Sequence, residues 1–200
     1  MSTVSHDDHH DHHEHEIASK IVFGFWVYLM TDAIMFAALF ATYAVLHNNT
    51  YGGIGIAQIA PLSLILHQSV VLLTSVFTFG LCSLSAHKGK LMQTRLWLII
   101  TFVLGALFVM MEKNLFAQLI DAGHTWQGSA FLSSYFTLVG LHWFHVIVGL
   151  VWMLLLFIQL GFQGLSFKMN IRFTCLGLFW SYLNIIWVFI FTIVYLTGAI

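Results

Sequence analysis

The sequence predicts an all-α integral membrane protein, a bundle of five transmembrane helices. Of its 200 residues, 60% are apolar and only 8% are charged. A soluble domain carries roughly 25% charged residues to wet its surface, so a chain this poor in charge cannot cover a soluble core. The net charge of −1 also argues against the basic surface of a nucleic-acid-binding protein. We therefore expect lipid to surround most of the chain, and no nucleic acid among its partners.

Five apolar stretches are long enough to cross a bilayer, because a membrane core of about 30 Å takes about 20 apolar residues in a helix. They form one transmembrane domain, residues 20–200, and glycine-rich or polar connectors such as Gly52-Gly53 and Asp121-Ala122-Gly123 separate them. The five predicted helices are Ile21–Leu46, Pro61–Ala86, Arg95–Phe116, Ser129–Leu160 and Ile171–Thr197.

The basic residues predict the orientation of the bundle. Only Lys113 falls on one side of the membrane; the other six of the seven Lys and Arg residues fall on the opposite side. The positive-inside rule assigns that basic side to the cytoplasm. We therefore expect a cytoplasmic amino terminus and a periplasmic carboxyl terminus. The six residues are Lys20, Lys88, Lys90, Arg95, Lys168 and Arg172.

The amino-terminal segment, residues 1–19, is rich in histidine and acid. Residues 6–16 hold six of the twelve histidines and five of the eight acidic residues. This composition predicts a disordered cytoplasmic tail. His12, His13, Glu14 and His15 could hold a divalent ion weakly, but a defined metal site needs ligands that a fold holds in place. The interpretation favoured here is a solvated tail without a defined site.

Polar residues inside the apolar stretches are the candidate functional residues, because a bilayer makes them costly. Asp32 lies near the middle of the first helix. An ionised carboxylate there needs a partner in a neighbouring helix, and otherwise it takes up a proton. Two interpretations stay open: a proton-relay group or subunit contact, and a protonated carboxyl hydrogen-bonded within the bundle.

Two histidines and a glutamate stand in the third and fourth helices. His142 and His145, spaced i and i+3, lie on one helix face, where we expect satisfied core histidines; haem ligation would need histidines from two facing helices. Glu112 lies beside Lys113 near the predicted end of its helix. An interfacial anchor pair is the expected role of these two residues. The sequence therefore predicts no catalytic, cofactor-binding or metal-binding residue.

Two functions of other classes remain as alternatives. A small membrane metal or proton carrier would use the histidine-rich tail as a collector and would line a polar pore through the bundle. A haem b electron carrier would need two facing histidines. The residues available for such a pore are Asp32, His67, Gln68, His142 and His145.

Four segments, in this order, resemble the third subunits of haem–copper quinol oxidases. They are residues 23–32 (FGFWVYLMTD), 40–44 (FATYA), 140–146 (GLHWFHV) and 191–198 (FTIVYLTG). The resemblance covers nearly the whole chain from Lys20 onward. The helix count also fits the quinol-oxidising branch, because third subunits of cytochrome c oxidases usually carry two further helices in front. A cytochrome c-fed oxidase is the alternative within the family.

The chain departs from the family pattern in three helices. The last helix has Ser181 and Asn184 where the family usually has a histidine and an aspartate, and these two changes remove titratable groups and leave hydrogen-bonding ones. The third helix has Leu115 three residues after Glu112, where the family often has a second glutamate. In the fourth helix Trp143 replaces a glycine, which implies different helix packing around residue 143.

The resemblance implies an accessory, non-catalytic subunit of a proton-pumping ubiquinol oxidase in the bacterial inner membrane. In that family the large subunit I holds the haems, the copper and the proton channels, and the third subunit has no redox centre. Subunits I, II and IV and membrane lipids are the implied partners. The polar residues expected to serve packing or the subunit interface are Asp32, Gln68, Glu112, His142, His145 and Asn184.

Overall fold

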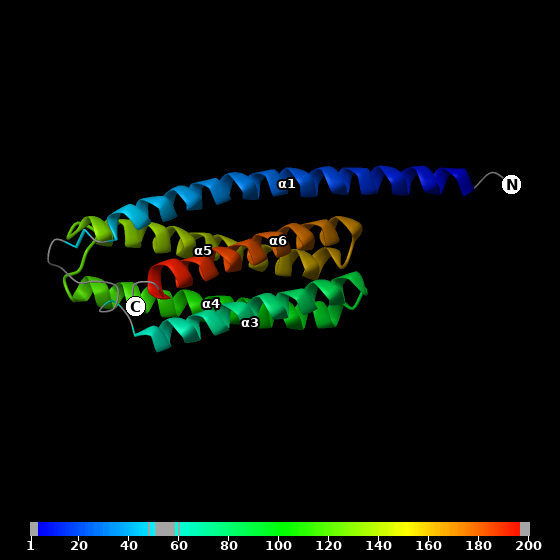
Figure 1. Cartoon of the computed structure of the whole chain (residues 1–200). Helices are drawn as coiled ribbons and strands as arrows, with labels where there is room; N and C mark the ends of the chain where they lie inside the picture. Colours follow the sequence, from blue (N-terminus) through cyan, green and yellow to red (C-terminus); the bar gives the residue numbers. More distant parts are fainter. Residues whose placement is uncertain (1–3, 48, 51–58, 60, 197–200) are drawn as a thin grey trace.

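The structure, a computed structural model, places long helices side by side (Figure 1). It describes residues 4–47, 49, 50, 59 and 61–196, and for residues 4–15 and 163 it describes the backbone alone. Within this part of the chain, five helices are long and apolar enough to cross a membrane. Their bounds are α1 Val4–Leu46, α3 Leu62–His87, α4 Leu91–Asp121, α5 Ala130–Gln163 and α6 Phe167–Ile190, which a π-helical turn, η1 Phe191–Leu196, continues.

The number and order of the predicted membrane helices are confirmed, and their ends differ by a few residues. Apart from the start of α1, the largest difference is in α4, which begins four residues before Arg95 and ends five residues after Phe116. The turns that join the helices use glycines with positive φ, Gly89 at 68° and Gly123 at 82°, a conformation that costs glycine little. The predicted loop glycines Gly52-Gly53 and the predicted helix end at Thr197 lie outside the described residues.

The first helix begins at Val4, so residues 4–19 are helical where the sequence predicted a disordered tail. Two physical reasons support this. The membrane span supplies a helical nucleus from which further turns add at low cost, and no glycine or proline precedes Gly24. Lys20 Nζ also lies 2.9 Å from Glu16 Oε1, at the favourable i, i+4 spacing. The side chains that were considered as weak metal ligands, those of His12, His13, Glu14 and His15, lie outside the described part.

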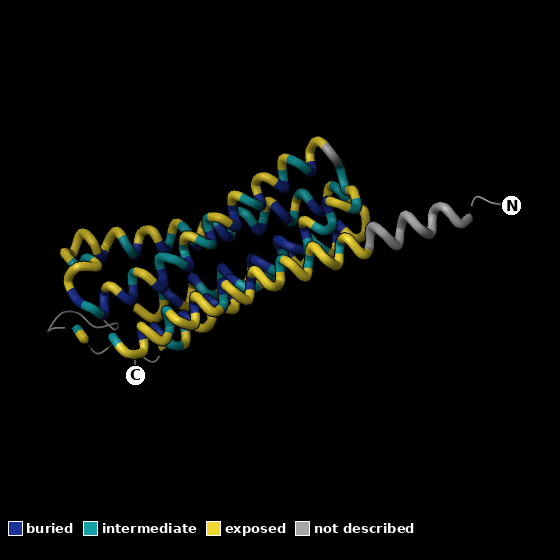
Figure 2. Tube along the Cα trace, turned by 90° about the horizontal axis from the view of Figure 1, so that it is seen from above, coloured by how far each residue is buried: buried dark blue, intermediate teal, exposed yellow. Residues whose placement is uncertain are grey.

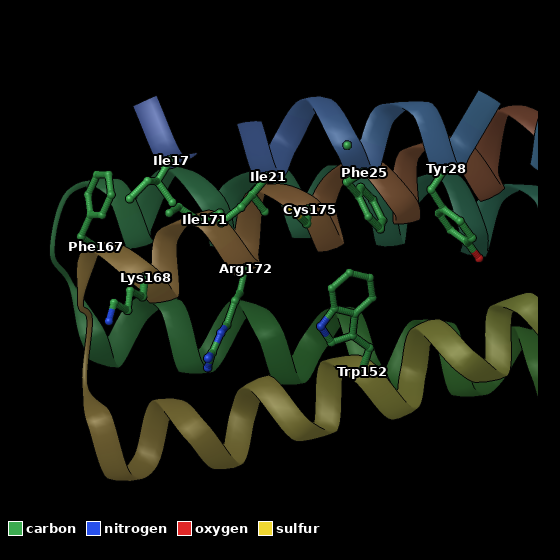
Figure 3. A pocket seen from close by; sticks show the side chains of 11 residues that line it. Ile17, Ile21, Phe25, Tyr28, Trp152, Phe167, Lys168, Ile171, Arg172 and Cys175 are labelled. Atoms are coloured by element: carbon green, nitrogen blue, oxygen red, sulfur yellow. The ribbon is translucent and has the colours of Figure 1, made fainter. Parts of the chain in front are cut away.

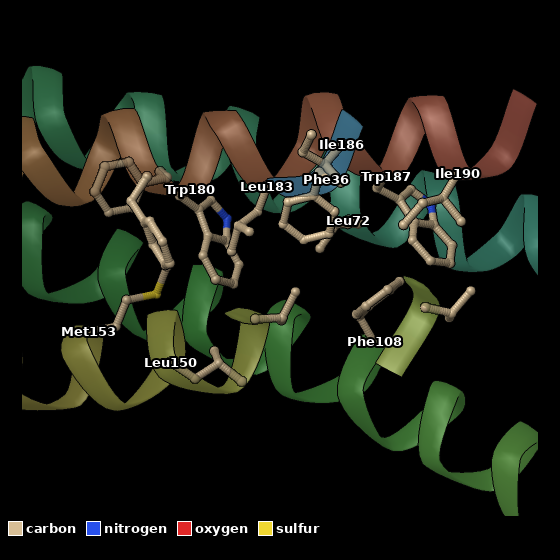
Figure 4. Close-up of a cluster of buried hydrophobic side chains, with 14 of the residues drawn as sticks. Phe36, Leu72, Phe108, Leu150, Met153, Trp180, Leu183, Ile186, Trp187 and Ile190 are labelled. Atoms are coloured by element: carbon tan, nitrogen blue, oxygen red, sulfur yellow. The ribbon is translucent and has the colours of Figure 1, made fainter. Parts of the chain in front are cut away.

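The core lies between α3, α4, α5 and α6, and α6 supplies its largest side chains. Trp180 and Trp187 are each 1% exposed and point from α6 into the bundle (Figure 4). Two glycines leave room for Trp180: a Cβ on Gly105 of α4 or on Gly149 of α5 would lie 2.9 Å from its ring. The Trp180 indole donates a hydrogen bond to Ser75 Oγ of α3 (3.1 Å). Small residues thus let the helices approach closely, as in other membrane bundles.

The α1 helix lies along one side of the bundle, against α5 and α6 (Figure 1). It is the least enclosed of the five helices. In an apolar stretch of 18 residues from each helix, 22% of the α1 residues are buried, against 44% in α6. Figure 2 shows this difference as a long exposed run on α1. The few α1 side chains that face inward therefore determine how it docks.

Candidate functional site

Asp32 of α1 and His145 of α5 form the first buried polar pair. Asp32 Oδ1 lies 3.3 Å from His145 Nε2, and the two side chains are 6% and 12% exposed. The other ring nitrogen, Nδ1, donates a hydrogen bond to the Leu141 carbonyl (2.8 Å). The ring therefore contacts its own helix through one nitrogen and the Asp32 carboxyl group through the other.

The contact matches an acid with a base, which lowers the cost of placing either group inside a membrane. The ring of Phe36 packs edge-on against His145 with 5.5 Å between centroids, and the Tyr182 hydroxyl of α6 interacts with Asp32 without a hydrogen bond of standard geometry. The pair therefore joins α1 to α5 in the interior.

His142 lies one helical turn from His145 and contacts a different helix. Its Nε2 donates a hydrogen bond to the Leu183 carbonyl of α6 (3.1 Å), and its ring lies 5.3 Å from that of Trp187. The two histidines thus have different partners: His142 contacts the Leu183 carbonyl and His145 contacts Asp32. His67 is exposed. Among the described residues, therefore, no second buried histidine faces His142 or His145 in the way that a haem b site requires.

Glu112 of α4 is fully buried, so the prediction that it anchors the helix at the interface is wrong. The reason is that α4 continues for nine residues beyond Glu112, to Asp121, which places Glu112 about 14 Å from the helix end at 1.5 Å per residue. Its neighbour Lys113 is exposed on the other face of the helix. Adjacent residues on a helix do not face each other, and the two side chains accordingly separate.

The Glu112 carboxyl faces the side-chain amide of Gln68 on α3. Both residues have 0% exposure. The two groups interact, although none of their four polar atoms makes a hydrogen bond of standard geometry with another described residue. In the described part of the chain no Lys, Arg or His forms an ion pair with Glu112. An isolated carboxylate is very costly in an apolar interior, so the lack of a described cationic partner sets Glu112 apart from Asp32.

Two tyrosines that the sequence analysis did not single out complete this second cluster. The hydroxyls of Tyr135 on α5 and Tyr195 on η1 are 2.8 Å apart, and both interact electrostatically with Glu112. Tyr135 is 0% and Tyr195 3% exposed. A buried tyrosine hydroxyl usually finds a hydrogen-bond partner, so tyrosines inside two apolar stretches were the signal that could have revealed the pair.

The departures from the family pattern have local structural solutions. Asn184 is buried, and its Nδ2 donates a hydrogen bond to the Trp180 carbonyl within α6 (3.1 Å). Trp143 is half-buried and donates from its indole nitrogen to the Val109 carbonyl of α4 (3.1 Å). The substituted residues therefore serve helix packing in α6 and at the α4–α5 contact.

A groove of 800 Å³ runs between α1, α5 and α6 near the start of α6. Figure 3 shows its apolar lining, which includes Ile21, Phe25 and Trp152, and the two basic side chains Lys168 and Arg172 at its edge. The Arg172 guanidinium donates a hydrogen bond to Gln159 Oε1 (2.6 Å). An apolar groove with basic side chains at its edge has the chemistry that attracts an anionic lipid.

The candidate polar residues do not form one pathway or one metal site. Asp32 and His145 lie together, Gln68 lies with Glu112, and His67 faces outward, so they do not line the common pore of a carrier. Among the side chains that the structure describes, no group of three or more His, Cys, Asp or Glu residues could hold a metal ion.

Comparison with known proteins identifies the family. The chain matches the family model of cytochrome c oxidase subunit III over residues 2–199. It is 52% identical over 179 residues to the cytochrome bo(3) ubiquinol oxidase subunit 3 of Pseudomonas aeruginosa, which covers 90% of this chain and 86% of that protein. The protein of the same name from Pseudomonas putida is 44% identical, with the same coverage. The cytochrome c oxidase subunit 3 of Bacillus sp. (strain PS3) is 37% identical, over 88% of this chain and 86% of that protein. This five-helix membrane chain therefore belongs to the cytochrome c oxidase subunit III family.

Proposed function

We propose that the chain is the accessory third subunit of a proton-pumping ubiquinol oxidase, which oxidises ubiquinol and reduces oxygen to water. The observation that carries the proposal is the near full-length similarity, at 52% and 44% identity, to two Pseudomonas proteins named as this subunit. The haems and copper belong to the large catalytic subunit I, and this chain binds and stabilises that subunit. Subunits II and IV complete the complex.

The buried polar residues then have structural roles in this subunit. Asp32 and His145 fasten the peripheral helix α1 to α5 (3.3 Å), and His142 fastens α5 to α6 (3.1 Å). Each contact joins two helices at membrane depth, as the hydrogen bond from Trp180 of α6 to Ser75 of α3 also does. A third subunit that holds its helices in register presents a constant face to subunit I.

The complex lies in the bacterial inner membrane with the amino terminus of this chain in the cytoplasm. Six of the seven Lys and Arg residues then face the cytoplasm, as the positive-inside rule requires. Lys168 and Arg172 lie on that side, so the groove beside them faces the leaflet in which anionic lipids attract basic residues. A reporter that is active only in the periplasm tests this orientation. We expect activity when it is fused after Ile200 and none when it is fused before Val4, and the opposite result would contradict the proposed orientation.

The test of the function is purification of the complex in mild detergent through a tag on the carboxyl terminus. We expect a larger haem-bearing chain to co-elute, and the eluate to consume oxygen when it is given ubiquinol. Elution of this chain alone and colourless contradicts the oxidase role and favours a carrier, whereas a red chain alone indicates haem b.

A cytochrome c-fed oxidase is the second candidate, because the similar protein from Bacillus sp. (strain PS3) is named a cytochrome c oxidase subunit 3. The two candidates differ in the electron donor. Oxygen uptake by the purified complex with ubiquinol but not with reduced cytochrome c supports the first candidate, and the reverse result supports the second.

A further inference from the structure

A second buried carboxyl group exists in this chain beside the Asp32–His145 pair, and the packing of α1 does not involve it. Glu112 has 0% exposure, and both of its oxygens lack a standard hydrogen bond to any described residue. The Gln68 amide beside it is equally buried and equally unpartnered. Two such groups facing each other in a dry helix interior are costly unless they bind something polar.

The described groups that interact with Glu112 come from three helical segments, and none of them is a cation. They are Gln68 from α3, Tyr135 from α5 and Tyr195 from η1. Tyr43 of α1 interacts in turn with both tyrosines. Lys113, the nearest basic residue in the sequence, is exposed. A carboxyl group among neutral amide and phenol groups is most stable when it binds a proton itself.

The position of the cluster gives the side from which a proton can arrive. Tyr43 lies three residues before the end of α1, Tyr135 five residues after the start of α5, and Tyr195 in the last turn of η1. All three ends lie on the same side of the bundle (Figure 1). The ring of Tyr43 lies 6.2 Å from the ring of His47, which is exposed at that end. Ionisable side chains therefore extend from the aqueous end of the bundle toward Glu112.

We propose that Glu112 is a proton-binding site of this subunit, and that its proton exchanges with water at that end of the bundle through the Tyr135–Tyr195 hydroxyl pair. A hydroxyl group can accept one proton and release its own. Transfer along the pair therefore returns each tyrosine to its neutral form, and only the carboxyl group gains or loses a proton. Gln68 can donate to the carboxylate and accept from the acid, so it accommodates both states.

Infrared difference spectroscopy of the assembled complex tests the proton on Glu112. The spectrum of wild type minus Glu112→Gln should contain the C=O stretch of a protonated carboxyl group at neutral pH, because the variant has lost it. Asp32→Asn is the matched control and should leave that band in place. A difference spectrum with carboxylate bands alone overturns the proposal. If Glu112→Gln does not assemble, Glu112→Asp should shift the same band, and an unshifted band overturns the proposal.

The exchange route has its own measurement, the shift of the Glu112 band after transfer of the complex to D₂O. Tyr135→Phe and Tyr195→Phe should each slow this shift relative to wild type, and Tyr28→Phe, an exposed tyrosine of α1, should not. Unchanged exchange in both buried variants overturns the route. Co-elution with subunit I is measured on every variant, so failure of the oxidase assignment is distinguished from failure of the proton site.

Discussion

The two buried carboxyl groups of this chain lie in opposite kinds of surroundings. Asp32 faces a base, the imidazole of His145 at 3.3 Å, and the pair joins the peripheral helix α1 to α5. Glu112 lies beside the Gln68 amide and interacts electrostatically with the hydroxyls of Tyr135 and Tyr195. The first carboxyl group thus has a basic partner on a neighbouring helix, whereas no described Lys, Arg or His forms an ion pair with the second.

The difference teaches that a buried carboxyl group can either hold a helix in place or store a proton, depending on its neighbour. Removal of an acid that pairs with a base leaves that base unpaired and weakens the contact between the helices. Removal of the proton-binding acid by a neutral isostere changes little in packing. Stability measurements on matched variants at the two sites therefore separate the two roles.

The largest expected effect is at Trp187, a fully buried side chain of α6. The centroid of its ring lies 4.7 Å from that of Phe108, 5.3 Å from that of His142 and 6.4 Å from that of Tyr195. Trp187→Ala should destabilise the subunit by about 3–5 kcal/mol, as large-to-small changes in a packed core do. Chemical unfolding in mild detergent measures this. The control is Trp126→Ala, because Trp126 is 55% exposed. Equal losses of stability in the two variants would mean that Trp187 does not lie in a packed core.

Next in size is the loss of the base at the first site. His145→Leu leaves Asp32 buried without its partner and should cost about 3 kcal/mol, near the lower end for a broken buried pair. The double variant Asp32→Leu, His145→Leu removes both groups and should recover most of that loss. A double variant as unstable as the sum of the single changes would show that the two residues are not coupled.

A smaller effect distinguishes the two acids directly. Asp32→Asn weakens the contact with His145 and should cost about 1.5–3 kcal/mol, the range for a hydrogen bond to a charged group. Glu112→Gln replaces a neutral acid by a neutral amide of the same shape and should cost less than about 1 kcal/mol. Both values come from the same unfolding titration. The reverse order would assign the structural role to Glu112.

The smallest effect is expected at Lys113. Its side chain is exposed, and exposed residues away from special contacts change stability by less than about 0.5 kcal/mol. Lys113→Ala should therefore leave both the unfolding midpoint and the Glu112 infrared band unchanged. A shifted band would mean that Lys113 reaches the carboxyl group after all.

The sequence predicted the helices well because hydropathy and length alone decide which segments cross a membrane. It also singled out Asp32 and His145, since each interrupts an apolar run. The sequence did not predict that these two residues pair, because the rotation of α1 against α5 depends on the packing of the whole bundle. The prediction that Glu112 lies at the membrane interface is wrong for a related reason. The sequence predicts a helix end at Phe116, whereas the helix continues to Asp121.

The pair of Tyr135 and Tyr195 illustrates a second limit of prediction from the sequence. Tyrosines often lie at membrane interfaces, where their rings are half wet, so Tyr135 and Tyr195 did not stand out in the sequence. Only the structure shows that their hydroxyls meet at 2.8 Å inside the bundle.

The π-helical turn at Phe191–Leu196 has a consequence for the genetics of this chain. A π turn contains one more residue than the α turn it replaces, so it is equivalent to a single-codon insertion in α6. Deletion of one exposed residue there, Thr192, would restore regular α-helical phase and would rotate every later side chain by about 100°. Tyr195 would then turn away from Tyr135. A one-codon deletion, with every buried side chain retained, would thus disconnect Glu112 from the end of the bundle.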